Sequence, residues 1–132
     1  MNIALIAHDA KKKLMQNFCI AYRGILDKHR LYATETTGRL IEEVTGLQLH
    51  KYLAGHLGGE QQIGALIESN ELDLVIFLTD PDSAQSHEMS LNRSIGRLCD
   101  IHNIPIATNL ATAELLIKSL DRGDMEWREM YK

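Results

Sequence analysis

The sequence predicts an α/β protein: a three-layer α/β/α sandwich with an open, mainly parallel, doubly wound sheet. Short apolar runs alternate five times with longer segments in which apolar residues recur at helical spacing, a pattern typical of parallel strands joined by helical crossovers. The apolar runs are nearly continuous, which indicates strands buried on both faces of the sheet. A chain of 132 residues is too short to divide into two well-packed halves, so we expect a single domain over residues 1–132.

The predicted strands are the apolar runs at residues 2–7, 31–33, 47–53, 72–78 and 104–107. The predicted helices have apolar residues three or four positions apart and follow the strands at residues 14–25, 37–46, 60–68, 91–99 and 112–120. Thr37 is expected to cap the second helix, Gly46 to end it, and Thr112 to begin the last helix. The third strand is the weakest prediction, because His50 and Lys51 interrupt its apolar run. Residues 122–132 contain no motif that assigns them a role.

Composition and charge exclude several classes of protein. The formal net charge is −4, from 14 Lys and Arg against 18 Asp and Glu, so the chain lacks the broad basic surface of a nucleic-acid-binding protein. The apolar runs are too short to span a bilayer, and the N-terminus lacks a basic flank and a cleavage site, so we expect a cytoplasmic protein with no membrane partner. Cys19 and Cys99 form no CxxC pair and fit a reducing compartment. The histidines lack the spacing of a metal site, so no metal is expected.

Polar residues follow every predicted strand. Because open parallel sheets bind ligands beyond the carboxyl ends of their strands, these residues are the candidates for a site. Strand by strand, they are His8, Asp9 and Lys11 to Lys13; Thr34 to Thr37; Ala54 to Glu60; Thr79, Asp80 and Pro81, with His87 further on; and Thr108 and Asn109. Cations, hydroxyls, glycines, carboxylates and imidazoles at one edge of a sheet are the groups that a phosphate-ester site uses.

The lysine run is the clearest local feature. Lys11, Lys12 and Lys13 stand in the first turn of a predicted helix, where the helix dipole disfavours each exposed cation by roughly 0.3–1 kcal/mol. An anion bound at that helix end would reverse the effect. Any one of these lysines is more simply explained as solvated surface, but we expect at least one of the three to face the sheet edge. Helical geometry slightly favours Lys11 for that position.

Two further turns carry candidate chemistry. The hydroxyl-rich turn from Thr34 to Gly38 offers threonines and backbone N–H groups to phosphate oxygens, and it equally fits plain helix capping. Glu60 follows Gly58 and Gly59 at a helix N-terminus, where it is either a general base or a partner of the helix dipole. A dinucleotide site is excluded because no G-x-G-x-x-G follows the first strand. A phosphorylatable receiver is excluded because Asn109 stands where a lysine is needed.

Six motifs occur along the chain in a specific order and spacing. They are Ala4-Leu5-Ile6-Ala7-His8-Asp9, Leu31-Tyr32-Ala33-Thr34-x-Thr36-Thr37-Gly38, Gly58-Gly59-x-Gln61-Gln62-Ile63-Gly64-Ala65, Leu74-Val75-Ile76-Phe77, Asp80-Pro81 with His87, and Ile104-Pro105-Ile106-Ala107-Thr108-Asn109. Together they resemble the methylglyoxal synthase family from the first residue to about Leu120. The resemblance implies the α/β sandwich already predicted, a cytosolic homohexamer, and no metal or organic cofactor.

The resemblance also implies a reaction. Dihydroxyacetone phosphate would bind through its phosphate, a carboxylate would remove a proton from the carbon next to the carbonyl, and the enediolate would expel inorganic phosphate to give methylglyoxal. By matching position, Glu60 would be the base, His8 and His87 would contact the carbonyl or enediolate oxygens, and Asp9 and Asp80 would orient the site. The phosphate-binding set would be Lys12, Thr34, Thr36, Thr37 and Gly55, with Glu35 and Ala54 in the same loops. Motif spacing selects Lys12 over Lys11.

The chain departs from the family pattern at the strand ends. Glu35 replaces a glycine, Ala54 a serine and Glu60 an aspartate, and a further aspartate is missing near Ser90. Glutamate is longer than aspartate by one methylene, on the order of 1.5 Å, and a misplacement of about 1 Å can lower a rate roughly a hundredfold. Two hypotheses follow: a methylglyoxal synthase-type lyase with an altered site, which we favour, or a non-catalytic binding, sensing or sequestering domain for a phosphorylated metabolite or nucleotide.

Overall fold

The computed structural model describes residues 1–52, 58–82 and 86–131, and residues 86–93 by their backbone alone. The strands in these ranges are β1 (Asn2–Ala7), β2 (Arg30–Thr34), β3 (His50–Tyr52), β4 (Leu74–Leu78) and β5 (Ile106–Ala107). The α-helices are α1 (Lys12–Ala21), α2 (Arg23–Leu26), α3 (Glu35–Thr45), α4 (Gly59–Glu68), α5 (Ser86–His102) and α6 (Leu110–Asp121). The described residues also form the 3₁₀ segments η1 (Asp9–Lys11) and η3 (Glu126–Tyr131). No helix within the described ranges is both long and apolar enough to cross a membrane.

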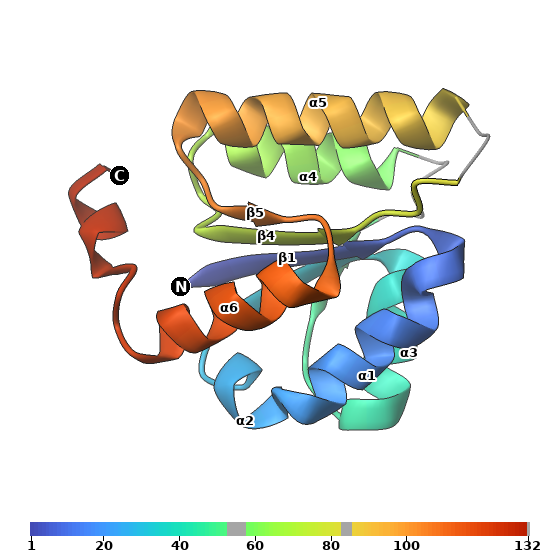
Figure 1. Ribbon diagram of the computed structural model, residues 1–132, viewed down its shortest axis with the longest axis horizontal. Helices are drawn as coiled ribbons and strands as arrows, with labels where there is room; N and C mark the ends of the chain where they lie inside the picture. Colours follow the sequence, from blue (N-terminus) through green and yellow to red (C-terminus); the bar gives the residue numbers. More distant parts are fainter. Residues whose placement is uncertain (53–57, 83–85, 132) are drawn as a thin grey trace.

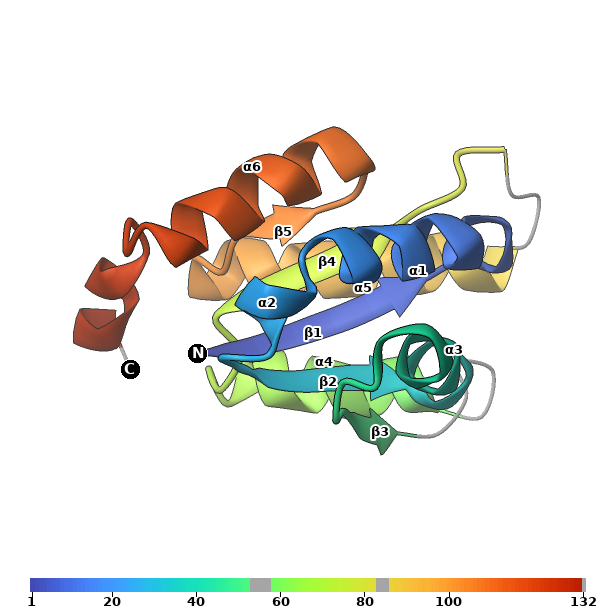
Figure 2. The same ribbon diagram turned by 90° about the horizontal axis from the view of Figure 1, so that it is seen from below.

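The strands form one open sheet in the order β3-β2-β1-β4-β5, and every neighbouring pair is parallel. Helices α1, α2, α3 and α6 cover one face, and α4 and α5 cover the other (Figure 1, Figure 2). This arrangement confirms the predicted three-layer, doubly wound sandwich. The strand order reverses between β1 and β4, because the chain runs outward from β1 to β3 and then returns to the other side of β1. Ligands of such sheets bind at this reversal, beyond the carboxyl ends of the strands.

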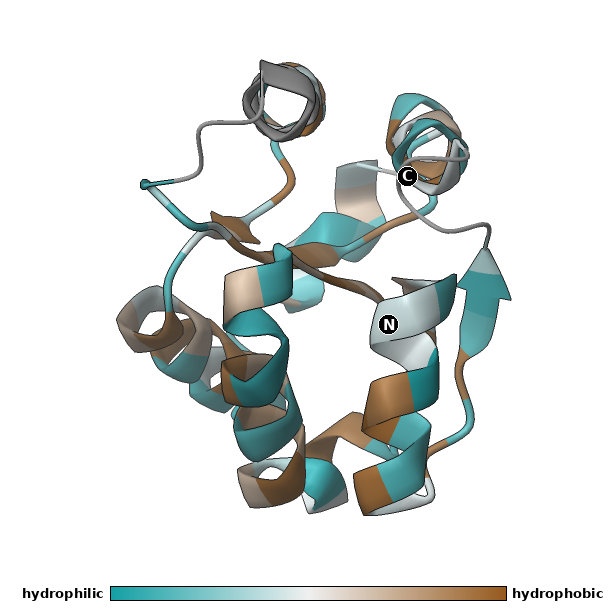
Figure 3. Ribbon diagram, turned by 90° about the vertical axis from the view of Figure 1, so that its right-hand side faces the viewer, coloured by the Kyte–Doolittle hydropathy of each residue, from teal (hydrophilic) through white to brown (hydrophobic). Residues whose placement is uncertain are grey.

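The central strand β1 is buried on both faces because its side chains alternate between two cores. Ile3 and Leu5 belong to the core beneath α1, α3 and α6, whereas Ala4 and Ile6 belong to the core beneath α4 and α5. None of the four is more than 2% exposed. In Figure 3 the strands inside the sandwich are coloured hydrophobic, whereas the edge strand β3 is hydrophilic. The polar residues that follow β1 and β4 therefore start from a well-packed apolar support.

Helix α3 begins earlier than predicted. Its first residue is Glu35 and its N-cap is Thr34, so Thr37 lies inside the first turn and does not cap the helix. The helix starts directly where β2 ends, because strand-to-helix connections in α/β units are short. Gly46 ends α3 in the left-handed conformation, with φ of 70°, which confirms the predicted helix end.

Helix α6 also begins earlier than the predicted Thr112. Its first residue is Leu110, and the side chain of Asn109 caps it by accepting a hydrogen bond from the Thr112 backbone N–H at 3.0 Å. Asparagine is among the preferred N-cap residues. The cap of α6 is therefore Asn109, the last residue of the motif at residues 104–109.

The first helix and the third strand are shorter than predicted. Tyr22, with φ of −110° and ψ of 22°, separates α1 from the one-turn helix α2. Among the described residues, His50–Tyr52 pair with β2, so β3 begins three residues later than the predicted start at Leu47. The preceding Leu47 is buried in the core without joining the strand ladder, and Leu53 lies outside the described residues.

The C-terminal residues, to which the sequence assigned no role, are anchored by Arg128. This residue is fully buried. Its guanidinium donates hydrogen bonds to a carboxylate, an amide oxygen and two backbone carbonyls: Asp73 Oδ1, Asn70 Oδ1, Asn103 O and Leu72 O. Asp73 is equally buried, and its Oδ2 accepts a hydrogen bond from the Asn2 backbone N–H at 2.8 Å. One ion pair therefore ties the tail to the starts of β1 and β4.

Replacing Arg128 tests this anchor. We expect Arg128→Met to lower the free energy of unfolding by about 3–5 kcal/mol, because it removes the cation from a buried carboxylate. Urea unfolding followed by circular dichroism measures the change. The control Arg122→Met removes an exposed guanidinium that pairs with Asp124, and it should leave the unfolding midpoint where it is. Equal midpoints for the two variants would contradict the anchoring role.

Candidate functional site

Lys12 connects the end of β1 to the first turn of α3. Its ammonium donates hydrogen bonds to Ala7 O at 2.9 Å and to Thr37 Oγ1 at 3.2 Å, and it lies 3.4 Å from Asp9 Oδ1. The Lys12 side chain is 17% exposed, whereas that of Asp9 is 91% exposed. Lys11 belongs to the preceding 3₁₀ turn, so the helical geometry that favoured Lys11 does not apply there. The structure therefore brings Lys12, among the candidate lysines, to the turn after β2.

The buried hydroxyls of Thr34 and Thr37 meet beside this ammonium. Thr34 donates its hydroxyl proton to Thr37 Oγ1 at 3.3 Å, and Lys12 donates to the same oxygen. A hydroxyl oxygen has two acceptor lone pairs and one proton. With both lone pairs of Thr37 occupied, its own proton is directed away from these two neighbours and is available to a ligand.

The first turn of α3 adds backbone N–H groups at the same place. The first N–H groups of a helix have no partner inside it and favour an anion. Thr34 makes no side-chain capping hydrogen bond to them, and Thr36 lies half-buried in this turn. Gly38 lets α3 pack closely, since a Cβ there would lie 2.6 Å from Lys51 Cγ. An ammonium, a hydroxyl and helix N–H groups around one space are the donor set of a phosphate site.

Glu35 lies in the same turn and has a cationic partner. Its Oε1 is 3.7 Å from Arg39 Nε, and both side chains are about half exposed. The carboxylate that would repel a phosphate is thus accompanied by a positive charge one helical turn away. Arg39 was not among the predicted site residues, because the helix was expected to begin at Thr37 and the spacing of four residues from Glu35 becomes a helical pair only when α3 begins at Glu35.

His8 and Asp80 meet where the strand order reverses, between the ends of β1 and β4. The His8 backbone N–H donates to Leu78 O at 3.0 Å, and His8 Nδ1 accepts from the Asp80 backbone N–H at 2.8 Å. Asp80 Oδ1 accepts in turn from the Asp82 backbone N–H at 3.0 Å. The ring of His8 stands edge-on to Phe77, at 5.3 Å between centroids and 85° between planes. His8 is 7% exposed, and its buried Nε2 has no hydrogen-bond partner within the described part of the chain.

Glu60 lies in the first turn of α4, at the same edge of the sheet. The N-cap of α4 is Gly58, with φ of 102°, a conformation that L side chains rarely adopt. Glycine is therefore required for α4 to begin where it does. Glu60 is half-buried with its Oε2 shielded from solvent, and it lines a cavity of about 240 Å³ between α4 and α5 together with Gly64 and Ser94.

Three predicted site residues have no described side chain. Ala54 and Gly55 lie outside the described residues, and His87 lies in the first turn of α5, where the backbone alone is described. Their roles stay predictions. In the described ranges, no group of three or more His, Cys, Asp or Glu is placed to hold a metal ion.

The two cysteines are free buried thiols. Burial raises the pKa of Cys19 and the pKa of Cys99 to about 12 each. Because the thiolate is the nucleophile, neither cysteine is a candidate for catalysis at neutral pH.

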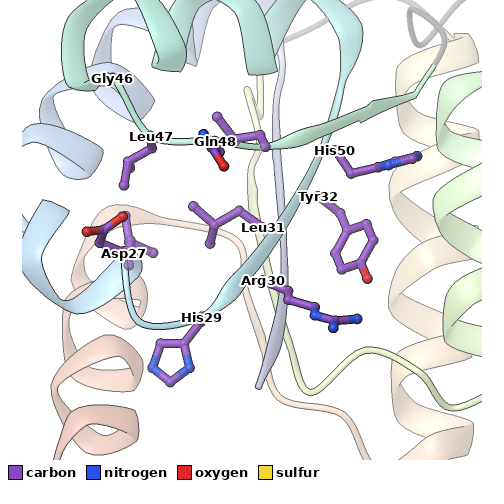
Figure 4. Close-up of a pocket in the computed structure, with 11 residues that line it drawn as sticks. Asp27, His29, Arg30, Leu31, Tyr32, Gly46, Leu47, Gln48 and His50 are labelled. Atoms are coloured by element: carbon purple, nitrogen blue, oxygen red, sulfur yellow. The ribbon is translucent and has the colours of Figure 1, made fainter.

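A cavity of about 640 Å³ lies at the opposite edge of the sheet, by the amino ends of β2 and β3 (Figure 4). His29, Arg30 and Gln48 are among its lining residues. His29 Nδ1 lies 3.0 Å from the Met1 ammonium, and burial, followed by that charge, lowers the pKa of His29. None of the predicted site residues lines this cavity, whose lining comes from the end of α2, the starts of β2 and β3 and the connections beside them.

Known proteins resemble this chain over most of its length. Residues 15–108 match the family model of the MGS-like domain. Methylglyoxal synthase of Caldicellulosiruptor saccharolyticus is 67% identical over 130 residues, which cover 98% of this chain and 92% of that protein. The chain belongs to the methylglyoxal synthase family.

Two more members of the methylglyoxal synthase family support the assignment. The enzyme of that name from Thermoanaerobacterium thermosaccharolyticum is 58% identical over 132 residues, covering 100% of this chain and 98% of that protein. A crystal structure of methylglyoxal synthase from Elizabethkingia anophelis NUHP1 has a TM-score of 0.81 and 43% identity, covering 88% of this chain and 76% of that one. These matches confirm the family resemblance inferred from the sequence motifs.

The Glu35–Arg39 pair predicts an electrostatic effect on anion binding. At low ionic strength, Arg39→Gln should weaken binding of inorganic phosphate about two- to fivefold, because it leaves Glu35 unneutralised beside the α3 N-terminus. Glu35→Gln should strengthen binding by a similar factor, and the double variant should bind like the wild type. Calorimetric titration at low and high salt measures these changes.

Glu43→Gln provides the matched control for that experiment. It also removes one negative charge from α3 but lies in a later turn, so phosphate affinity should change little. An equal effect of Glu35→Gln and Glu43→Gln would contradict a local role for Glu35. Effects that persist at high salt would contradict an electrostatic one.

Proposed function

We propose that this protein converts dihydroxyacetone phosphate to methylglyoxal and inorganic phosphate. The observation that carries the proposal is the cluster of Lys12, Thr37 and the first turn of α3, which lies at the same edge of the sheet as the buried imidazole of His8 and as Glu60. The name and 67% identity of the relative from Caldicellulosiruptor saccharolyticus support it.

The substrate is held through its phosphate. Lys12 supplies the cation, and Thr34, Thr36 and Thr37 supply hydroxyl and backbone donors. Gly55 and Ala54 complete the predicted phosphate-binding set and lie outside the described residues. The hydrogen bonds that Lys12 already makes to Ala7 O and Thr37 Oγ1 hold its ammonium in place before the ligand arrives. Asp9, 3.4 Å from the ammonium, adds a third restraint. A positioned cation of this kind needs little reorganisation when the anion binds.

The carboxylate of Glu60 begins the reaction. It removes a proton from the hydroxymethyl carbon next to the carbonyl, and the electron pair of that C–H bond forms the double bond of an enediolate. His8 and His87 donate hydrogen bonds to the oxygen that gains charge. Asp80 positions His8 through its backbone N–H. General acid–base chemistry of this kind calls on no metal and no organic cofactor.

Loss of phosphate completes the reaction. The hydroxyl on the former hydroxymethyl carbon gives its proton to the departing phosphate and becomes the aldehyde carbonyl. The carbon–carbon double bond shifts by one position, and the C–O bond to phosphate breaks. Phosphate leaves with the electron pair of that bond, and Lys12 and the N–H groups of α3 stabilise the negative charge that it gains. The remaining enolate takes up one proton on its terminal carbon, which balances the proton that Glu60 removed, and becomes methylglyoxal.

We also propose a cytoplasmic homohexamer, as the family resemblance implies. Several large apolar side chains of the described chain are exposed and suit contacts between subunits: Leu115, Met130 and Tyr131. Sedimentation measurements on the purified protein determine the number of subunits.

A product assay tests the proposed activity. The wild type incubated with dihydroxyacetone phosphate should release methylglyoxal and inorganic phosphate in equal amounts. Glu60→Gln should lower the rate by roughly 10²–10⁴-fold, because it removes the general base while keeping the size of the side chain. No product above the Glu60→Gln background would rule out the lyase. Thermal stabilisation by a phosphorylated compound without turnover would then favour a binding domain.

Shortening the base tests whether Glu60 is well placed. If the pocket keeps the dimensions suited to the family's aspartate, Glu60→Asp should raise kcat, because about 1 Å of displacement is enough to alter a rate by roughly a hundredfold. Steady-state kinetics on the two proteins decides the point. A fall in kcat would show that the site has adapted to glutamate.

A further inference from the structure

The hydrogen bonds of His8 assign the position of its proton. The Asp80 backbone N–H can only donate, so His8 Nδ1, which lies 2.8 Å away, must present a lone pair. A neutral imidazole that accepts at Nδ1 carries its proton on Nε2. The ring is therefore a neutral hydrogen-bond donor with its N–H at Nε2.

The surroundings of His8 keep the ring in this orientation. The ring is 7% exposed and stands edge-on to Phe77, which is itself fully buried. A half-turn of the ring would replace Nδ1 by a carbon and leave the Asp80 N–H without its acceptor. Backbone pairing to Leu78 O at 3.0 Å fixes the main chain of His8 against β4. Both the orientation and the tautomer are thus set by β4 and the residues that follow it.

The Nε2–H group is buried, and within the described ranges nothing accepts its hydrogen bond. Buried donors in folded proteins are normally paired, so an exception indicates a missing acceptor. In the proposed reaction, the acceptor with the greatest need of a donor is the substrate oxygen that becomes negative in the enediolate.

We infer that the backbone N–H of Asp80 and the ring of Phe77 are positioning groups that hold His8 as the Nε2–H tautomer, so that a neutral imidazole donates to the enediolate oxygen. This inference rests on the proposed function. A neutral donor stabilises the developing charge through a hydrogen bond and keeps its proton, so it needs no reprotonation between turnovers. His8 then stabilises the developing charge electrostatically, and groups other than His8 transfer the protons.

Nitrogen-15 NMR of the imidazole rings tests the tautomer directly. In the ligand-free protein at neutral pH, His8 should show a protonated Nε2 and an unprotonated Nδ1, and the His8→Gln variant assigns the signals. The exposed His50 serves as a control and should show the averaged signals of a ring that exchanges between tautomers. A His8 proton on Nδ1, or averaged signals like those of the control, would overturn the inference.

Two substitutions test the catalytic consequence. The amide nitrogen of glutamine reaches the place of Nε2, whereas that of asparagine reaches only the place of Nδ1. His8→Asn should lower kcat by roughly 10²–10³-fold, the loss typical of one oxyanion donor, and His8→Gln should recover at least about tenfold of it. The difference should lie in kcat, with similar KM values for both variants. Equal kcat values would contradict a donor at Nε2.

The two experiments separate the inference from the proposed function. A wild type that makes no methylglyoxal but shows the Nε2–H tautomer refutes the proposed reaction and leaves the assignment of the proton standing. An active wild type with its His8 proton on Nδ1 refutes the inference alone. The NMR measurement uses the wild type and does not depend on the folding of a variant.

Discussion

The site depends on one interaction, the bridge that the Lys12 ammonium makes between the end of β1 and the first turn of α3. It joins Ala7 O to Thr37 Oγ1 and so places a cation beside the N–H groups of the helix. Without a bound anion these positive groups oppose one another, and an anion makes their effects additive. The sheet supplies the rigidity, because β1 is buried on both faces and ends where the strand order reverses. His8 is the residue that follows β1, and Lys12 binds the last carbonyl of the same strand. The cation and the oriented imidazole therefore lie at one edge of the sheet.

The structure shows the surroundings of two residues that depart from the family pattern, Glu35 and Glu60. Glu35 is accompanied by Arg39 on the exposed side of α3, so its charge is compatible with a phosphate bound in the same turn. Glu60 retains a carboxylate at the start of α4, and Gly58 retains the left-handed N-cap conformation from which α4 begins. The substitution at position 60 thus keeps a carboxylate at the start of α4, while it changes the reach of the base. This is the pattern expected of a working enzyme with altered rates.

Much of the fold was predictable because its signals are local. Continuous apolar runs identified the strands, helical spacing identified the helices, and the rule for parallel sheets identified the edge that carries the site. Helix starts were predicted less well, because the N-cap positions fall on Thr34 and Asn109, the residues that end the two strand motifs. The role of Arg128 was not predictable, since a lone arginine in a polar tail resembles a surface residue and its partner Asp73 lies 55 positions away. The neutral form of His8 likewise depends on a backbone group that no sequence pattern marks.

The central claim is that the carboxyl edge of the sheet captures a phosphoryl group next to an acidic side chain. A crystal structure of the protein grown with inorganic phosphate tests it most directly. The account predicts the anion within hydrogen-bonding distance of the Lys12 ammonium, the Thr37 hydroxyl and the first N–H groups of α3, with the Glu60 carboxylate facing the same space. An empty edge, or an anion bound instead in the cavity by His29 and Arg30, would contradict it.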